Sequence, residues 1–373
     1  MNITITGADG FIAKNLIASL EQQAQHQLFF YKRGDDDKVL QDCISKSDVI
    51  FHLAGENRPK KISAFEITNV GLTELICSEV SKTNRNIPII FSSSTQAIQD
   101  NPYGVSKLSA EKILEVFAQN FSNTVITFRL CGVFGKWCKP NYNSVVSTFC
   151  YNIANNIPLE VSNPAQELDL IYIDDVVNMF NSTLEKIASY KSYNLHPISE
   201  FFTISLQYII NSIELFKQSR NSLIIPEVGT GFLRALYATY LSHLNPKQFS
   251  YPLEENKDER GSFIEILKTR SSGQFSFFTA HPGVTRGGHF HHTKNEKFLI
   301  LQGKARFYFK NINTHETYTL IIAAENKKVI ETIPGWSHDI TNIGNDEMLV
   351  LLWANEIFDP LIPDTYSYNL YDE

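Results

Sequence analysis

The first half of the chain alternates between two kinds of apolar segment, and this alternation constrains the fold more than any other feature. Runs such as residues 48–55 and 124–135 are mostly apolar, whereas residues 10–23 place apolar side chains at helical spacing. Strands buried on both faces have the first pattern, and strands that alternate with helices form parallel sheets. We therefore predict an α/β fold with a doubly wound parallel sheet for this half.

The pattern changes near residue 241. Residues 242–253 have the composition of a linker, and short aromatic runs separated by turns follow from there on. Such runs are typical of antiparallel β-sandwiches and small barrels. Because 373 residues exceed an ordinary domain of about 150 residues, we predict two domains, residues 1–245 and an all-β domain of residues 246–373.

Charge, hydropathy and cysteine content narrow the functional classes. A formal net charge of −7 argues against broad binding to nucleic acid or to anionic membranes. No apolar run approaches the roughly 18 residues of a membrane span, and the N-terminus lacks the charged region of a signal peptide. The cysteines are scattered and odd in number, which indicates reduced thiols. We expect a cytoplasmic protein that binds neither nucleic acid nor membrane.

A glycine-rich turn follows the first predicted strand. Gly7, Gly10 and Ala13 form the pattern Gly-x-x-Gly-x-x-Ala between a strand and a helix. Glycine lets backbone amides approach a pyrophosphate at a helix N-terminus. Glycine between a strand and a helix is common for turn reasons alone, but this context at the start of the chain indicates a Rossmann-type dinucleotide site.

The end of the second predicted strand bears on the choice of cofactor. Lys32 and Arg33 arrive there before a run of aspartates. Basic residues at this position suit the 2′-phosphate of NADP, whereas an acidic residue would hold the ribose hydroxyls of NAD. We predict NADPH as the cofactor. The alternatives are NAD held by Asp35, or a solvated charged loop.

Ser94, Tyr103 and Lys107 form a candidate catalytic set. Tyr103 and Lys107 are four residues apart and share one helix face. An ammonium group beside a phenol can lower its pKa and hold the cofactor ribose, so that the phenol exchanges a proton with a carbonyl oxygen. Ser94 ends a strand and can hydrogen-bond to the same oxygen. A Tyr-x-x-x-Lys pair alone is usually structural, but its place behind a glycine-rich turn favours catalysis.

Together these motifs resemble the extended short-chain dehydrogenase/reductases that act on nucleotide sugars. The resemblance covers residues 1–245 and includes Asn69. It implies that Ser94, Tyr103 and Lys107 are the catalytic residues. The cofactor contacts that it implies are Gly7, Gly10, Phe11, Ile12, Lys32, Arg33, Leu53, Ala54, Gly55, Tyr103 and Lys107.

Two positions depart from the pattern of that family, and a nearby loop offers substrate contacts. Ala13 stands where the family usually has glycine, and Gly132 stands where it often has asparagine. The first departure adds one methyl group at a helix–strand contact, and the second removes a side chain that faces substrate. Asn141 and Asn143, with Ser94, are the candidate substrate contacts. A polar loop without a ligand is the alternative for the two asparagines.

Four residues of the second half have the spacing of a metal site. His289 and His291 alternate, which on a strand places both on one side and His292 on the other. Glu296 follows after a short turn, and a Pro-Gly turn precedes His338. Three neutral imidazoles and one carboxylate suit Zn²⁺, Fe²⁺, Mn²⁺ or Ni²⁺. We predict that His289, His291, Glu296 and His338 bind one divalent ion, with zinc expected.

The same spacing resembles both halves of the cupin motif. Residues 258–265 and 285–292 also resemble the metal-free cupins that epimerise 4-keto-deoxy sugar nucleotides, in which the histidine at the position of His289 is the base. His289 therefore has two rival roles, and the complete set of four favours the metal. The base is then another polar residue of the barrel. The candidates are Tyr308, His281 and Lys297.

A reductase fused to such a cupin resembles a family of bifunctional enzymes of capsule and O-antigen synthesis over essentially the whole chain. The resemblance implies that the cupin epimerises C3 of a UDP-2-acetamido-2,6-dideoxy-hexos-4-ulose and that the reductase then reduces the C4 ketone with NADPH. The product would be UDP-N-acetyl-6-deoxy-L-talosamine, on the route to UDP-N-acetyl-L-fucosamine. We expect a homodimer, with the cupin as a candidate contact. The alternatives are a reductase whose cupin only dimerises or senses a ligand, and a regulator with a degenerate reductase, against which the intact catalytic set argues.

Overall fold

The computed structural model describes residues 1–23, 25–59 and 61–371. The chain forms two compact units. Unit 1 comprises Met1–Ile213 and Thr230–Leu244, and unit 2 comprises Glu214–Gly229 and Asn245–Glu373. Among the described residues, no helix combines the length and the apolar character needed to cross a bilayer.

The central sheet of unit 1 has the strand order β2-β1-β3-β4-β5-β8. Its strands are β1 (Asn2–Thr6), β2 (Gln27–Tyr31), β3 (Val49–His52), β4 (Ile89–Ser94), β5 (Val125–Leu130) and β8 (Tyr193–Pro197). All neighbouring pairs are parallel, so that Ile5, for example, lies opposite Phe30 on one side and Phe51 on the other. This sheet confirms the predicted α/β fold class.

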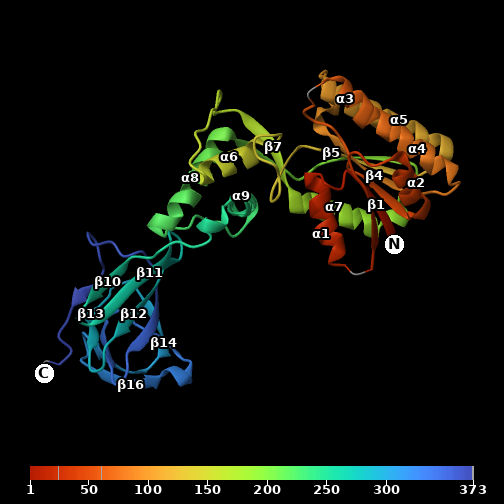
Figure 1. The fold of residues 1–373 in the computed structure, drawn as a ribbon. Helices are drawn as coiled ribbons and strands as arrows, with labels where there is room; N and C mark the ends of the chain where they lie inside the picture. The colour runs from red at the N-terminus through yellow and green to blue at the C-terminus, as the bar shows by residue number, and fades with distance from the viewer. Residues whose placement is uncertain (24, 60, 372–373) are drawn as a thin grey trace. The chain divides into compact units, whose positions relative to one another are not determined.

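Helices cover both faces of this sheet (Figure 1). Helices α1 (Phe11–Glu21) and α7 (Ile173–Glu185) pack on one face, and α2 (Asp37–Lys46), α4 (Leu72–Lys82) and α5 (Pro102–Phe121) on the other. Within β3, Phe51 packs against the first layer and Ile50 against the second. Because both residues are fully buried, the strand has a continuous apolar sequence.

Shorter elements complete unit 1. The helical segments are α3 (Ser63–Phe65), a π-helical turn η1 (Glu66–Gly71), η2 (Thr95–Ile98), α6 (Val145–Ala154), η3 (Ile187–Ser189) and α9 (Gly231–Ser242). A small sheet has the order β6-β7-β9, with β6 (Gly132–Phe134), β7 (Glu167–Tyr172) and β9 (Phe202–Ser205). Helix α8 (Leu206–Ser222) follows, and its last residues group with unit 2. There the Arg220 guanidinium donates to the Gln248 carbonyl, and Ile224 forms a bridge with Lys268.

Unit 2 consists of two antiparallel sheets. The first contains β10 (Glu255–Asp258), β11 (Gly261–Thr269), β12 (Gly273–Ala280), β19 (Met348–Ala354), β14 (Glu296–Gln302) and β17 (Val329–Glu331), in that order. The second contains β16 (Thr317–Ala323), β15 (Lys304–Asn311), β18 (Trp336–Asn342), β13 (Thr285–Phe290) and β20 (Tyr366–Ser367). Short turns η4 (Pro246–Gln248) and η5 (Ala324–Asn326) lie outside the sheets. The all-β, cupin-like class predicted for this half is confirmed.

The two sheets of unit 2 enclose one apolar core. Phe298 and Val350 from the first sheet pack with Phe307 and Ile340 from the second. Phe298 and Phe307 meet edge to face, with ring centroids 5.7 Å apart. Inward-facing side chains alternate with outward-facing ones along each strand, as the pleat requires.

A β-bulge in β13 sets the position of His289 relative to the neighbouring strand β18. The register against β18 shifts between Gly287 and His289. Gly287 and Gly288 both have positive φ, at 101° and 81°, and a Cβ at Gly287 would lie 2.7 Å from the His338 carbonyl oxygen. The bulge brings His289 directly opposite His338 across the two strands.

The core of unit 2 yields a stability prediction. Phe307→Ala removes a side chain with no exposed surface, so it should destabilise unit 2 by about 3–5 kcal/mol. Phe275→Ala, on the outward face of β12 and 42% exposed, should cost no more than about 1 kcal/mol. Denaturant unfolding of the full chain, followed in the transition of unit 2, measures both. Equal losses for the two variants would contradict the inward and outward assignment.

Candidate functional site

The glycine-rich turn joins β1 to α1 at the sheet edge where β1, β2 and β3 end. Gly7 has φ +68°, and a Cβ there would lie 2.7 Å from the Cα of Ala54. Gly10 is the N-cap of α1 and provides no side-chain cap, so the first N–H groups of the helix remain available to an anion. Phe11 and Ile12 begin the helix. The turn therefore fits the pyrophosphate of a dinucleotide.

The basic residues after β2 lie beside two carboxylates. Lys32 pairs with Asp9 at 3.2 Å, and Arg33 pairs with Glu56 at 2.8 Å. Asp35 is occupied differently, because its carboxylate accepts the backbone N–H of Lys32 at 2.7 Å. The guanidinium group of Arg33 thus faces the ends of β2 and β3, where the adenosine half of a dinucleotide binds in doubly wound folds.

Glu56 was not among the predicted residues. It directly follows Leu53, Ala54 and Gly55 and is buried. Its second carboxylate oxygen accepts the phenol O–H of Tyr142 at 3.2 Å. Its backbone N–H and C=O both bond to the side chain of Asn69, at 2.7 and 3.0 Å. Glu56 therefore links the predicted cofactor region to the loop after β6.

The candidate catalytic side chains converge at the end of β4 and the start of α5. Lys107 is buried, donates to the Ser92 carbonyl at 2.8 Å and lies 4.6 Å from the ring centroid of Phe91. Burial lowers the pKa of Lys107 to about 8, although the Glu111 carboxylate opposes the shift. Burial raises the pKa of Tyr103, and a hydrogen bond with Ser94 partly offsets that shift.

The protonation states of Tyr103 and Lys107 allow Tyr103 to act as a proton donor. A phenol whose pKa lies above its ordinary value is neutral and keeps its proton near pH 7. Lys107, with a pKa of about 8, remains mainly protonated at that pH. A Cβ at Gly55 would lie 3.5 Å from the Lys107 ammonium and 3.3 Å from the Asn69 amide oxygen, so glycine lets the loop close against the catalytic helix.

The candidate substrate asparagines lie apart from these contacts. Asn141 and Asn143 are both exposed, and Asn141 donates its backbone N–H to Thr148 at 2.9 Å. The residue between them, Tyr142, is the one that reaches Glu56. The assignment of Asn141 and Asn143 as substrate contacts stays a prediction.

The four predicted metal ligands of unit 2 come together. One ligand atom from each of His289, His291, Glu296 and His338 lies within 4.8 Å of all the others. Three are buried and His289 is partly exposed. The Nε2 atoms of His291 and His338 each lie 3.4 Å from the same Glu296 oxygen, and neither nitrogen has a hydrogen-bond partner within residues 1–23, 25–59 and 61–371. Buried imidazole nitrogens that converge without partners fit a divalent cation.

The charge states of this cluster also suit a cation. Burial, together with the neighbouring His338, lowers the pKa of His289 to about 4, so the imidazole is neutral at pH 7. Burial raises the pKa of Glu296, but His291, His338 and Lys294 beside it hold that pKa well below its ordinary value. Metal ligands must be deprotonated, and His289 and Glu296 already are at pH 7.

The positions around the cluster differ from what strand alternation suggested. Strand β13 ends at Phe290, so His291 reaches the cluster from the following turn and not from the strand. His292 is exposed and packs against Phe290 and Tyr366, away from the other three histidines. The same-side placement of His289 and His291 therefore depends on the turn as well as on the pleat.

Each of the base candidates has a partner elsewhere. Lys297 pairs with Glu331, His281 lies 3.4 Å from Glu347, and Tyr308 stacks on Tyr371. Lys294, which the sequence reasoning missed, is buried with its ammonium 3.4 Å from the free oxygen of Glu296. It gave no signal in the sequence, because Lys294 lies in the turn before β14, where strand alternation does not apply.

Comparison with known proteins decides the family. Residues 3–195 match the model of the NAD dependent epimerase/dehydratase family. The chain belongs to this family. A nicotinamide cofactor follows from the membership, and the open N-terminus of α1 fits it. Residues 256–366 match the polysaccharide biosynthesis C-terminal domain.

Two relatives match the full length of the chain. A Pseudomonas aeruginosa protein named UDP-2-acetamido-2,6-beta-L-arabino-hexul-4-ose reductase is 47% identical over 98% of both chains. The crystal structure of the capsular polysaccharide assembling protein CapF from Staphylococcus aureus is 40% identical, with a TM-score of 0.91 over 99% of this chain and 100% of that one. These matches confirm the resemblance to the capsule-synthesis enzymes that join a dehydrogenase/reductase to a cupin.

More distant matches concern the fold of unit 1. An Escherichia coli dTDP-4-dehydro-6-deoxyglucose reductase is 24% identical over 60% of this chain and 83% of its own. A UDP-glucuronic acid 4-epimerase structure from Bacillus cereus is 21% identical, with a TM-score of 0.52 over 58% of this chain and 84% of its own. At this identity the structural likeness indicates a shared fold and nothing further.

The position of Arg33 generates a prediction about cofactor choice. Arg33→Gln should weaken NADPH binding by about 10–100-fold and leave NADH binding nearly unchanged, because a charge-assisted bond to the 2′-phosphate is lost. We choose glutamine and not aspartate, because an aspartate at position 33 would repel the Glu56 carboxylate even without cofactor and so disturb the site itself. Fluorescence titration with both cofactors gives the two dissociation constants.

The matched control for Arg33 is Lys38→Gln, which removes an exposed positive charge outside the predicted contacts. It should leave the ratio of the two dissociation constants unchanged. If Arg33→Gln leaves that ratio unchanged as well, Arg33 does not read the 2′-phosphate.

The cluster of unit 2 generates a prediction about metal content. The protein purified without chelators should hold one divalent ion, His338→Ala should lose most of it, and His292→Ala should keep it. Because the ion would join β18 to β13 and β14, chelation should lower the melting temperature of unit 2 and leave unit 1 nearly unchanged. Elemental analysis and calorimetry measure these effects. Less than about a tenth of an equivalent of any divalent metal in the unmutated protein would overturn the metal assignment.

Proposed function

We propose that the chain is a bifunctional enzyme that acts on a UDP-2-acetamido-2,6-dideoxy-hexos-4-ulose. Residues 246–373 would epimerise C3, and residues 1–245 would reduce the C4 ketone with NADPH to UDP-N-acetyl-6-deoxy-L-talosamine. This product lies on the route to UDP-N-acetyl-L-fucosamine for capsule or O-antigen. The full-length 47% identity to a protein named for reduction of a UDP-4-keto sugar carries the proposal, and the convergence of Ser94, Tyr103 and Lys107 supports it.

The reductase step assigns one role to each residue of the catalytic set. A nicotinamide cofactor held at the glycine-rich turn of Gly7 and Gly10 would supply the hydride for C4. Tyr103 donates its phenol proton to the C4 oxygen, for which its raised pKa keeps it protonated. Ser94, hydrogen-bonded to Tyr103, holds the same oxygen in line. Lys107 is four residues from Tyr103 on the same helix, and its positive charge would stabilise the phenolate that forms.

The choice of NADPH depends on Arg33. The guanidinium lies beside Glu56, where the adenosine half of a dinucleotide binds in this fold. Asp35 supports the NAD alternative poorly, since its carboxylate already bonds to the backbone of its own turn. We therefore propose that Arg33, with Lys32 behind it, receives the 2′-phosphate.

Epimerisation at C3 relies on the ketone at C4. The ketone acidifies the C3–H bond, so removal of the proton gives an enolate, and return of a proton from the opposite face inverts the centre. A divalent ion in the cluster would supply a Lewis acid for the C4 oxygen. Lys294 adds a positive charge beside Glu296, and this charge would also stabilise the negative charge of the enolate. The partly exposed His289 lies on the open side of the cluster, and it would be the base if no metal binds.

A reductase with a non-catalytic cupin is the second candidate. The printed name of the Pseudomonas relative mentions reduction alone, which favours this alternative. In it the cupin would dimerise or sense a ligand. Incubation of the substrate with the protein in D₂O without NADPH separates the two proposals: deuterium at C3 requires an active cupin, and its absence leaves only the reductase.

We also propose that the protein is cytoplasmic and forms a homodimer.

The assignment of Tyr103 generates a prediction that separates the two activities. Tyr103→Phe should reduce the rate of NADPH oxidation at least about 100-fold, because the phenol supplies the proton to the C4 oxygen. Deuterium exchange at C3 should continue at the rate of the unmutated protein, which shows that the variant is folded and that the substrate reaches the cupin. Reduction at a near-normal rate would remove Tyr103 from the catalytic set.

A further inference from the structure

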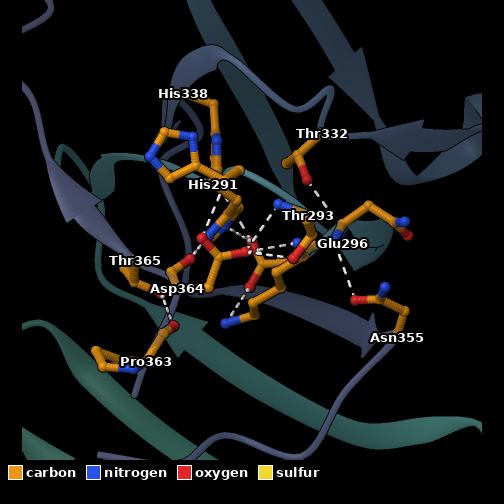
Figure 2. Close-up of polar contacts among 12 residues, drawn as sticks. His291, Thr293, Glu296, Thr332, His338, Asn355, Pro363, Asp364 and Thr365 are labelled. Atoms are coloured by element: carbon orange, nitrogen blue, oxygen red, sulfur yellow. Dashed lines mark hydrogen bonds and ion pairs between the residues drawn. The ribbon is translucent and has the colours of Figure 1, made fainter. Parts of the chain in front are cut away.

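The segment that follows β19 returns to the cluster through one residue, Asp364. Its carboxylate accepts the backbone N–H groups of His292, Thr293 and Lys294, at 2.9, 2.8 and 2.8 Å. It also accepts the hydroxyl of Thr293 at 3.0 Å. The Asp364 carboxylate thus binds residues 292–294 of the turn between His291 and Glu296, and Figure 2 shows Asp364 beside His291 and Thr293.

The main chain of Asp364 contacts a cluster residue directly. Its carbonyl oxygen accepts a hydrogen bond from Nδ1 of His291 at 2.6 Å. An imidazole that donates through Nδ1 is neutral only when Nε2 carries no proton, so its lone pair is available there. That Nε2 is the atom that lies 3.4 Å from Glu296 inside the cluster.

Asp364 adopts a backbone conformation that the surrounding contacts must maintain. Its φ is +33°, a backbone conformation that residues other than glycine rarely adopt. The conformation aims the carboxylate at one side of the turn and the carbonyl at His291. A strained residue that makes five hydrogen bonds to one short turn points to a positional role.

The flanking residues tie the same segment to the other members of the cluster. We name residues 358–371 the C-terminal strap. The Lys294 ammonium lies 5.6 Å from the ring centroid of Phe358, and Ser367 pairs with His289 across β20 and β13. Tyr371 donates its O–H to Asp339, the neighbour of His338, at 2.5 Å. The strap therefore contacts two cluster residues, His289 and His291, and the residues beside the other two, Lys294 and Asp339.

We propose that Asp364 is a positioning residue that holds His291 in the tautomer and orientation required to bind a divalent metal ion. The inference depends on the metal site of the proposed function, and it concerns a residue that the ligand spacing does not include. Partners that orient a ligating histidine typically change metal affinity about 10–100-fold when they are lost. The carboxylate acts through the turn, and the carbonyl acts through Nδ1.

The test uses the full-length protein stripped of metal and titrated with Zn²⁺ against a competing chelator. Asp364→Ala should weaken Zn²⁺ binding by about 10–100-fold. Asp359→Ala is the matched control, because this carboxylate lies on the same strap and accepts only the backbone N–H of Leu361 among the contacts of the described chain. It should bind Zn²⁺ as the unmutated protein does.

A second readout distinguishes positioning from general loss of stability. In the metal-free protein, ¹⁵N chemical shifts of the histidine rings should show His291 as the Nδ1–H tautomer, and Asp364→Ala should convert it to a mixture. If Asp364→Ala does not fold, Asp364→Asn is used instead. It keeps the side-chain volume and one acceptor oxygen, and should give a smaller loss in the same direction.

The outcomes separate this inference from the proposed function. If the unmutated protein binds Zn²⁺ and the Asp364 variant binds it within about twofold with an unchanged tautomer, the positioning role is wrong. If the unmutated protein binds no Zn²⁺, the metal function fails and positioning for metal fails with it. A weakened affinity together with a changed tautomer supports the inference.

Discussion

The nucleotide site depends on close packing around the loop that follows β3. A Cβ at Gly7 would collide with Ala54 of this loop, and a Cβ at Gly55 would lie within 3.3 Å of the Asn69 amide oxygen and in contact with Lys107 at 3.5 Å. The glycine-rich turn, the π-helical segment η1 and helix α5 thus meet at one short backbone stretch. A dinucleotide bound along this loop would contact both the glycine-rich turn and Lys107.

The two units bury charge in different ways, and the difference bears on function. In unit 1, Lys107 has a carbonyl partner and Glu111 accepts three bonds from the Arg129 guanidinium, so these buried charges are satisfied by the chain itself. In unit 2, Glu296 lies beside His291, His338 and Lys294, yet the Nε2 atoms of the two histidines have no hydrogen-bond partner among the described residues. An unpartnered buried nitrogen is costly unless a ligand bonds to it. The buried charges of unit 1 are satisfied within the protein, whereas a cation would satisfy the nitrogens of unit 2.

The sequence predicted the parallel sheet, the antiparallel second half and the residues of the cluster, because each depends on short-range periodicity or on spacing within a motif. It did not predict the bulge at Gly287, which depends on a register between distant strands. The placement of His291 in a turn was missed for the same reason. Glu56 and Asp364 were not predicted, because a single carboxylate has no local sequence signature. The contact of Glu56 with Arg33 and that of Asp364 with His291 are visible only in the structure.

The proposed order of reactions requires the reductase site to distinguish the two C3 epimers, which Ser94, Tyr103 and Lys107 cannot do alone. Reduction removes the ketone that makes C3–H acidic, so epimerisation must precede it. The raised pKa of Tyr103 keeps the phenol protonated below and around neutral pH, which means that the proton donor is ready for either C3 epimer. Discrimination must therefore come from groups that contact the sugar away from C4. The loop that carries Tyr142 is a candidate for this role, because the Tyr142 phenol bonds to Glu56, which pairs with Arg33 of the predicted cofactor site.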